Sequence, residues 1–232
     1  MSRKKRNKII EMPEATTTRA SAVEIIPRNT KQEEYLQYLS DNSKKIVFSL
    51  GPAGTGKTLL ATLQALKMFK QGQINKIYLT RPAVEVSGEK HGFLPGGIAE
   101  KMDPWVRPVF DIFEEYYTPK EIQSLLEENL IEISPLAYMR GRNFKNCVVL
   151  FDESQNSTVD QMKMILTRLG DNARMFVTGD IGQKDHRRNG LNDFLERLSI
   201  NKKQSIGLIE FEKCHVERSK IVKDILDIYG DE

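Results

Sequence analysis

The fold of this chain is decided by one stretch, Gly51-Pro52-Ala53-Gly54-Thr55-Gly56-Lys57-Thr58. A short apolar run, Ile46-Val47-Phe48-Ser49-Leu50, precedes it and predicts a buried strand. After it, apolar residues recur at three- or four-residue steps from Leu59 to Phe69, which predicts a helix. The stretch matches G-x-x-x-x-G-K-[ST] between a strand and a helix, which is the position that a phosphate-binding P-loop requires.

Each part of this stretch has a predicted role in binding ATP. The residues from Gly51 to Gly56 let backbone N–H groups turn toward phosphate oxygens, and the start of the next helix adds its positive dipole end. Lys57 is predicted to reach the β- and γ-phosphates, and the Thr58 hydroxyl is predicted to ligate Mg²⁺. A glycine-rich turn that merely caps a helix is the alternative.

Two acids follow a second apolar run and support this interpretation. Cys147 to Phe151 predicts a buried strand, and Asp152 and Glu153 come directly after it. Asp152 at the carboxyl end of a neighbouring strand is placed to hold Mg²⁺. Glu153 is placed to act as the general base for an attacking water. A kinase for small molecules does not need this second acid, so the pair favours hydrolysis.

A third group follows the strand Met175-Phe176-Val177. Thr178 and Asp180 flank Gly179, and Gln183 lies just beyond. Ligands of open α/β sheets bind outside the carboxyl ends of the strands, so these side chains are candidates for sensing the γ-phosphate or its water. An ordinary Gly-Asp turn explains the same residues equally well.

Arg218 lies on the apolar face of a helix predicted over 217–229, three residues before Ile221. It either extends along that face to solvent or binds an anion. A γ-phosphate in its own chain, or in a neighbouring subunit that it enters as an arginine finger, suits the second interpretation.

The remaining pattern alternates strands and helices. Strands are predicted at 76–80, 130–134, 174–178 and 207–211, and helices at 31–39, 158–169, near 98–117 and at 119–129. This alternation predicts an α/β fold: a mostly parallel sheet with helices on both faces. We expect one domain, 27–232, after a flexible basic tail, 1–26.

Composition excludes several classes of protein. The 232 residues are 39% hydrophobic, as in ordinary globular proteins, and no apolar run approaches the roughly 18 residues that span a bilayer. The two cysteines fit no zinc, redox or disulfide pattern, and no secretory signal is visible, so we expect a cytoplasmic protein without membrane partners. The net charge of +3 comes from residues 1–8, which carry five cations; without them, 30 cations face 32 anions.

Several motifs together resemble the PhoH family over about 30–229. They are Gly51–Thr58, Arg81-Pro-Ala-Val84, Gly92-Phe-Leu-Pro-Gly96, Glu100-Lys-Met-Asp-Pro104, Arg107-Pro108, Arg140-Gly-Arg142, Asp152-Glu-Ser-Gln-Asn156 and Thr178-Gly-Asp180. The resemblance implies a RecA-like core related to superfamily 1 helicases, with ATP binding, hydrolysis and involvement with RNA. It also makes 81–130 a family-specific insert. The compact length is similar to copies carried by bacteriophages, which implies a bacterial or host cytoplasm.

The resemblance also assigns roles to single residues. It places Gln32 where related helicases have an adenine-reading glutamine, and Gln155 in an Asp-Glu-x-Gln pattern. Gln183 matches the glutamine after the Gly-Asp turn, and Arg218 matches the late arginine of the family.

Candidate contacts to a nucleic acid are spread along the chain: Arg81, Lys90, Trp105, Arg140 and Arg142. Cations that follow phosphates and aromatic rings that stack on bases hold single strands, although Trp105 is equally suited to a core. No second RecA-like core follows, so translocation requires a homo-oligomeric ring, such as a hexamer.

The sequence thus predicts an Mg²⁺-dependent ATPase coupled to single-stranded RNA or DNA, with helicase activity left open. The alternative is an ATP-gated interaction protein with negligible turnover. A GTPase is disfavoured, because Asn75-Lys76 is not followed by the Asp of a guanine-reading Asn-Lys-x-Asp motif.

Overall fold

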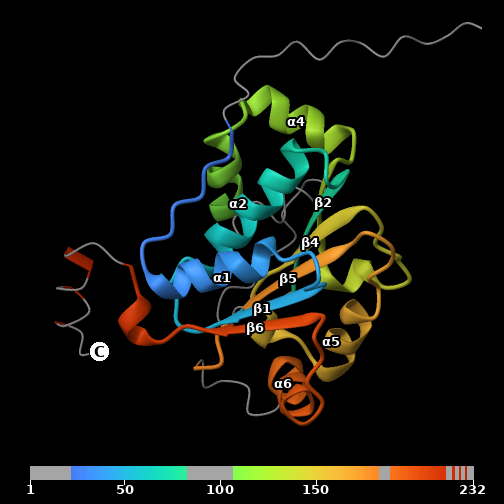
Figure 1. The fold of residues 1–232 in the computed structure, drawn as a ribbon. Helices are drawn as coiled ribbons and strands as arrows, with labels where there is room; N and C mark the ends of the chain where they lie inside the picture. The colour runs from blue at the N-terminus through green and yellow to red at the C-terminus, as the bar shows by residue number, and fades with distance from the viewer. Residues whose placement is uncertain are drawn as a thin grey trace, which may run out of the picture.

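A computed structural model describes residues 22–82, 107–182 and 189–217, together with residues 221, 222, 225 and 228. Its centre is a six-stranded sheet, in the order β3-β2-β4-β5-β1-β6 (Figure 1). The strands are β1 Ile46–Leu50, β2 Lys76–Arg81, β3 Ile131–Pro135, β4 Cys147–Phe151, β5 Arg174–Gly179 and β6 Ile206–Glu210. All neighbouring pairs are parallel, which confirms the predicted α/β fold.

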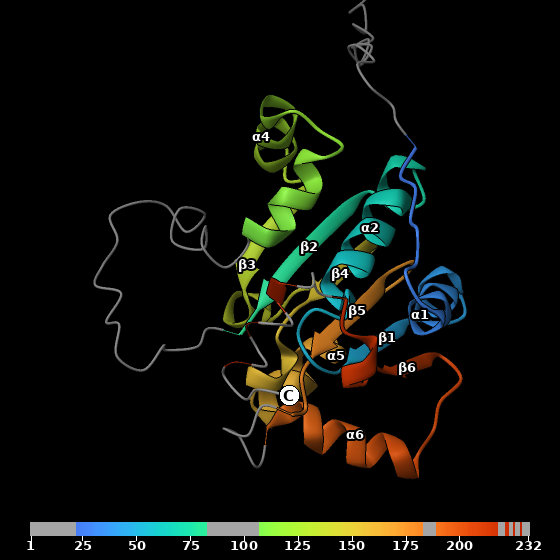
Figure 2. The ribbon, with the colours of Figure 1, turned by 90° about the vertical axis from the view of Figure 1, so that its left-hand side faces the viewer.

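Helices cover both faces of the sheet (Figures 1 and 2). One face carries α1 Thr30–Ser40, α2 Lys57–Lys70 and α4 Pro119–Glu127, with a further helix at 107–114. The other face carries α5 Val159–Leu166 and α6 Gly190–Ile200. Short 3₁₀ turns, η1 Leu136–Met139, η2 Ser154–Asn156 and η3 Lys213–His215, follow β3, β4 and β6. Of the predicted insert, 81–130, the described residues are 81–82 and 107–130, and Arg81 belongs to β2. The segment 107–130 packs through Val109, Ile112, Phe113 and Ile122 on the α2 face.

The helix α6 is absent from the predictions above, which place no element between the fifth and sixth strands. Its start is capped by Asn189, whose side chain accepts a hydrogen bond from the Asn192 N–H at 2.8 Å. Leu191 is fully buried, and Phe194 stacks on Phe48 of β1 with ring centroids 5.1 Å apart. Tertiary packing of this apolar stripe therefore stabilises the helix.

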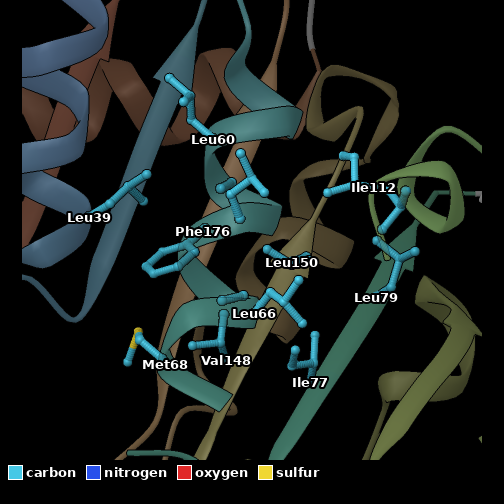
Figure 3. Packing of buried hydrophobic residues seen from close by; sticks show 14 of the residues in the cluster. Leu39, Leu60, Leu66, Met68, Ile77, Leu79, Ile112, Val148, Leu150 and Phe176 are labelled. Carbon is cyan, nitrogen blue, oxygen red and sulfur yellow. The ribbon is translucent and has the colours of Figure 1, made fainter. Parts of the chain in front are cut away.

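The central strands explain the apolar runs of the sequence, because both of their faces are buried. Figure 3 shows Leu66 and Met68 of α2 near Val148 of β4 and Phe176 of β5, in the core on the α2 face. Cys147, Val149 and Phe151 of β4 belong to the core on the α5 face. A strand buried on both faces has a continuous apolar run in place of alternation.

The end of α1 is held by one buried cation, Arg174, the first residue of β5. Its guanidinium donates to the carbonyls of Leu39 at 2.6 Å, Asp41 at 3.0 Å and Tyr38 at 3.1 Å. It also donates to the Lys44 carbonyl at 2.9 Å. Burial lowers the pKa of Arg174 to about 10, which leaves the guanidinium charged at neutral pH. Arg174 thus satisfies carbonyls that a helix end leaves without intrahelical partners.

Candidate nucleotide-binding site

One cleft at the carboxyl ends of β1, β4 and β5 brings together three groups that the sequence singled out. Its volume is about 290 Å³, near the lower end of the range for small-ligand pockets. Its lining residues are Ala53, Gly54, Gly56, Lys57, Thr58, Leu59, Asp152, Glu153, Thr178, Gly179 and Asp180. Parallel strands end at the same edge of a sheet, which is why these separate segments meet.

The P-loop closes around the side chain of Lys57. Its Nζ donates to the carbonyl oxygens of Gly51 and Pro52, both at 2.7 Å, and lies 3.2 Å from Thr55 Oγ1. Burial lowers the pKa of Lys57, and the carboxylates of Asp180, Glu153 and Asp152 act in the opposite direction. The amine therefore lies in a cradle of backbone carbonyl groups.

The helix that follows, α2, begins without a capping side chain. Its N-cap is Gly56, with φ of 84°, and no side-chain hydrogen bond from the described residues caps the start of the helix. Those N–H groups need acceptors, and phosphate oxygens at a helix N-terminus supply them. The loop and helix start therefore fit a nucleotide's phosphates.

Asp152 lies next to two hydroxyl groups. Its Oδ1 accepts hydrogen bonds from Thr58 Oγ1, at 3.0 Å, and from Thr178 Oγ1. A carboxylate and a hydroxyl side by side are hard oxygen donors that suit Mg²⁺ when substrate phosphates complete the coordination. Within the described ranges, no cluster of three or more His, Cys, Asp or Glu side chains forms a separate metal site. These residues fit the predicted Mg²⁺.

Glu153 has a left-handed backbone, with φ of 51° and ψ of 41°. The other non-glycine residues with positive φ in the described chain are asparagines, which tolerate this region better. The conformation costs about 1–2 kcal/mol, so surrounding contacts must hold it. Those contacts come from Arg81, whose Nη2 lies 3.2 Å from Oε1, and from Gln155, whose Nε2 donates to Oε2 at 2.5 Å.

Gln155 also connects Glu153 to the loop after β5. Its Oε1 accepts from the Asp180 N–H at 3.0 Å, while its Nε2 binds Glu153. This close approach depends on Gly179, because a Cβ there would lie 2.6 Å from Ser154 Oγ and 3.2 Å from Gln155 Oε1. The Asp-Glu-x-Gln pattern thus corresponds to a physical bridge between β4 and β5.

The side chain of Gln32 contacts both the P-loop and the segment before α1. Its Nε2 donates to the Thr55 carbonyl at 3.0 Å, its Oε1 accepts from the Arg28 N–H at 2.9 Å, and it is buried. In this structure the amide therefore braces the P-loop.

A second brace of the P-loop was missed by sequence reasoning. The Glu217 N–H donates to the Gly54 carbonyl at 2.9 Å, and Glu217 Oε1 accepts from Asn29 Nδ2 at 2.9 Å. Asn29 and Glu217 are 188 positions apart, and no local pattern connects them.

The candidate nucleic-acid contacts separate into three groups. Arg81 forms an ion pair with Glu153, and Arg142 forms an ion pair with Glu132 and lies over the Tyr78 ring at 5.7 Å. Arg140 is exposed and lines an open groove of about 600 Å³ between η1 and α5, together with Lys163 and Arg168. The other predicted site residues, Lys90, Trp105, Gln183 and Arg218, lie outside the described residues.

Comparison with known proteins gives one family match and several relatives. Residues 24–230 match the family of PhoH-like proteins. The PhoH-like protein of Mycobacterium tuberculosis strain H37Rv is 42% identical over 212 residues, 89% of this chain and 58% of the relative. That of Bacillus subtilis strain 168 is 42% identical over 219 residues, 93% of this chain and 67% of the relative. Protein PhoH of Escherichia coli K12 is 40% identical over 211 residues, which are 89% of this chain and 58% of the relative.

The chain therefore spans just under three fifths of the length of most of these relatives. Among solved structures, the Sulfolobus solfataricus SWI2/SNF2 ATPase core in complex with dsDNA matches with a TM-score of 0.44 at 14% identity. That match covers 70% of this chain and 34% of the other. No helix among the described residues is long and apolar enough to span a bilayer.

Proposed function

This chain belongs to the PhoH-like protein family, and from that premise we propose that it is an Mg²⁺-dependent ATPase coupled to single-stranded RNA or DNA. The observation that carries the proposal is the position of Glu153. Its carboxylate lines the same cleft as Lys57 and Asp152, yet the Thr58 and Thr178 hydroxyls bind Asp152 alone. Two acids with separate partners suit two separate roles, metal binding and proton acceptance.

Hydrolysis would use these side chains in a defined order. Lys57 would exchange the carbonyls of Gly51 and Pro52 for phosphate oxygens. Thr58 and Asp152 would hold Mg²⁺, which would supply positive charge to those oxygens. Glu153 accepts a proton from a water whose oxygen attacks the γ-phosphorus, and the bond to the β–γ bridging oxygen breaks. The products are ADP and inorganic phosphate.

The groove between η1 and α5 supports the nucleic-acid part of the proposal. Arg140, Lys163 and Arg168 face one acid in its lining, Asp160, and the neighbouring Tyr138 side chain is 59% exposed. An exposed ring beside several cations suits a strand whose bases stack and whose phosphates pair. The helix α5, which lines the groove, begins shortly after η2, and η2 directly follows Glu153, so only a short segment of chain separates this acid from the groove.

The last helical residues support the proposed homo-oligomer. Ile221, Val222, Ile225 and Ile228 are 37–82% exposed in the single chain. An apolar stripe of this kind is typical of a surface that a second copy covers.

We expect wild-type protein with ATP and Mg²⁺ to release phosphate about 100-fold faster than Glu153→Gln, because a general base contributes at least this factor. Glu153→Gln should still bind a fluorescent ATP analogue, whereas Lys57→Ala should bind it weakly. Phosphate release is measured with and without a single-stranded RNA 20-mer. The matched control is Lys67→Ala, near the other end of α2, which should behave like wild type.

If wild type releases phosphate no faster than Glu153→Gln under either condition, while both bind the analogue, the ATPase proposal is wrong. The ATP-gated interaction protein would then be the function that fits.

A further inference from the structure

Arg81 lies at the end of β2, directly beside the end of β4 that carries the acid pair. Thr80 is paired with Phe151, and the Asp152 N–H continues the ladder by donating to the Thr80 carbonyl at 3.0 Å. This pairing brings the Arg81 guanidinium to 3.2 Å from Glu153 Oε1. The sheet thus fixes the two side chains as neighbours.

Both oxygens of Glu153 are engaged in this structure. Oε1 pairs with Arg81, and Oε2 accepts from Gln155. A general base must present a lone pair to the water that it deprotonates, and releasing one of these partners clears one side of the carboxylate for that water. The Gln155 amide is buried and also bound to the Asp180 N–H, whereas the Arg81 side chain is 28% exposed. Arg81 is therefore the partner that an incoming ligand can reach.

We propose that Arg81 couples strand binding to ATP hydrolysis: a phosphate of the bound single strand competes with Glu153 for Arg81 and so frees Glu153 Oε1 for the water. This inference rests on the proposed ATPase function. The exchange is chemically reasonable, because a guanidinium binds carboxylate and phosphate oxygens equally well. Arg81 stays paired, since the strand brings its own anion, while the Glu153 carboxylate gives up its cation and keeps the Gln155 amide as a partner. Arg81 is then a positioning residue and not a catalytic one.

Turnover at saturating ATP tests the restraint that Arg81 imposes. Arg81→Met keeps the aliphatic length and removes the charge, so basal phosphate release should rise about fivefold above wild type. The 20-mer should stimulate wild type by a similar factor and stimulate Arg81→Met by less than about twofold. Arg81→Lys retains a charge and should keep part of the stimulation. The matched control is Lys44→Met, which removes a cation at the opposite edge of the sheet, where Lys44 Nζ binds the Gln204 carbonyl.

Strand affinity gives a readout that does not depend on hydrolysis. Glu153→Gln removes the competing carboxylate, so it should bind a fluorescent single-stranded RNA 20-mer about fivefold more tightly than wild type, by anisotropy without ATP. Arg81→Met should bind it more weakly, with a salt slope smaller by about one. In the double variant the gain from Glu153→Gln should vanish, which is the coupling that a double-mutant cycle measures.

The outcomes separate this inference from the proposed function. If wild type hydrolyses ATP but Arg81→Met is equally fast or slower and still stimulated, Arg81 does not restrain Glu153 and the inference is overturned while the ATPase stands. If neither protein releases phosphate above Glu153→Gln, the ATPase proposal fails, and the inference fails with it. Should Arg81→Met fold poorly in a thermal melt, Arg81→Gln replaces it in both measurements.

Discussion

Gly51→Ala is expected to abolish nucleotide binding and to lower the midpoint of thermal unfolding by about 10 °C. Gly51 has φ of 133°, a region that only glycine occupies, and a Cβ there would lie 2.3 Å from the Phe211 carbonyl oxygen. Phe211 cannot withdraw freely, because its N–H donates to the Leu50 carbonyl at 2.7 Å. The change therefore costs about 3 kcal/mol or more in the free energy of unfolding. It also displaces the carbonyl that holds Lys57.

The measurements are a thermal melt and titration with a fluorescent ATP analogue, whose affinity should fall about 100-fold or more. Gly72→Ala is the matched control, because Gly72 also has positive φ, 67°, yet a Cβ there meets nothing within 4 Å. It should cost only about 1 kcal/mol and leave binding intact. Equal losses in both variants would show that backbone strain alone, and not the contact with Phe211, makes glycine necessary at 51.

Methionine at position 174 is expected to destabilise the protein by about 3–5 kcal/mol. The replacement fills a similar volume but leaves four carbonyls, those of Tyr38, Leu39, Asp41 and Lys44, without the donor that Arg174 provides. Urea denaturation followed by circular dichroism measures the loss as a lower midpoint at an unchanged slope.

Arg197→Met is the control for this prediction. Arg197 is 73% exposed and pairs with Asp193 one turn away on α6, so its loss should cost about 0.5 kcal/mol or less. A loss below about 1 kcal/mol for Arg174→Met would mean that water replaces the guanidinium at the end of α1.

The strands were predictable because each buried strand is a short run of consecutive apolar residues in the sequence. The predicted runs 46–50 and 147–151 coincide with β1 and β4, and the other four strands agree within one residue at each end. For α5, Thr158 and Gln161 form the predicted capping box. The helix α6 was missed even though Leu191, Phe194 and Leu195 have helical spacing and Asn189 is a favourable N-cap residue. Gly190, with its low helix propensity, is the first helical residue and is more typical of a turn.

The site was predictable only where its chemistry is contiguous in sequence. The P-loop and the Asp152-Glu153 pair each occupy adjacent positions, and the structure brings them into one cleft. The pairing of Arg81 with Glu153 depends on β2 lying next to β4, which no local pattern specifies. For the same reason Arg142, predicted as a nucleic-acid contact, is found paired with Glu132 of β3.

The helix α1 is fixed at both of its ends, so it connects the P-loop to the opposite end of the sheet over a fixed length. Its start presents Gln32 to the Thr55 carbonyl of the P-loop, and its end is bound by Arg174 at the opposite edge. Its eleven residues give a helix about 16 Å long. A substitution that removes the Arg174 contacts should therefore weaken the hold of α1 on the P-loop, although it lies far from the loop itself. Nucleotide affinity should then report on the stability of the opposite end of the sheet.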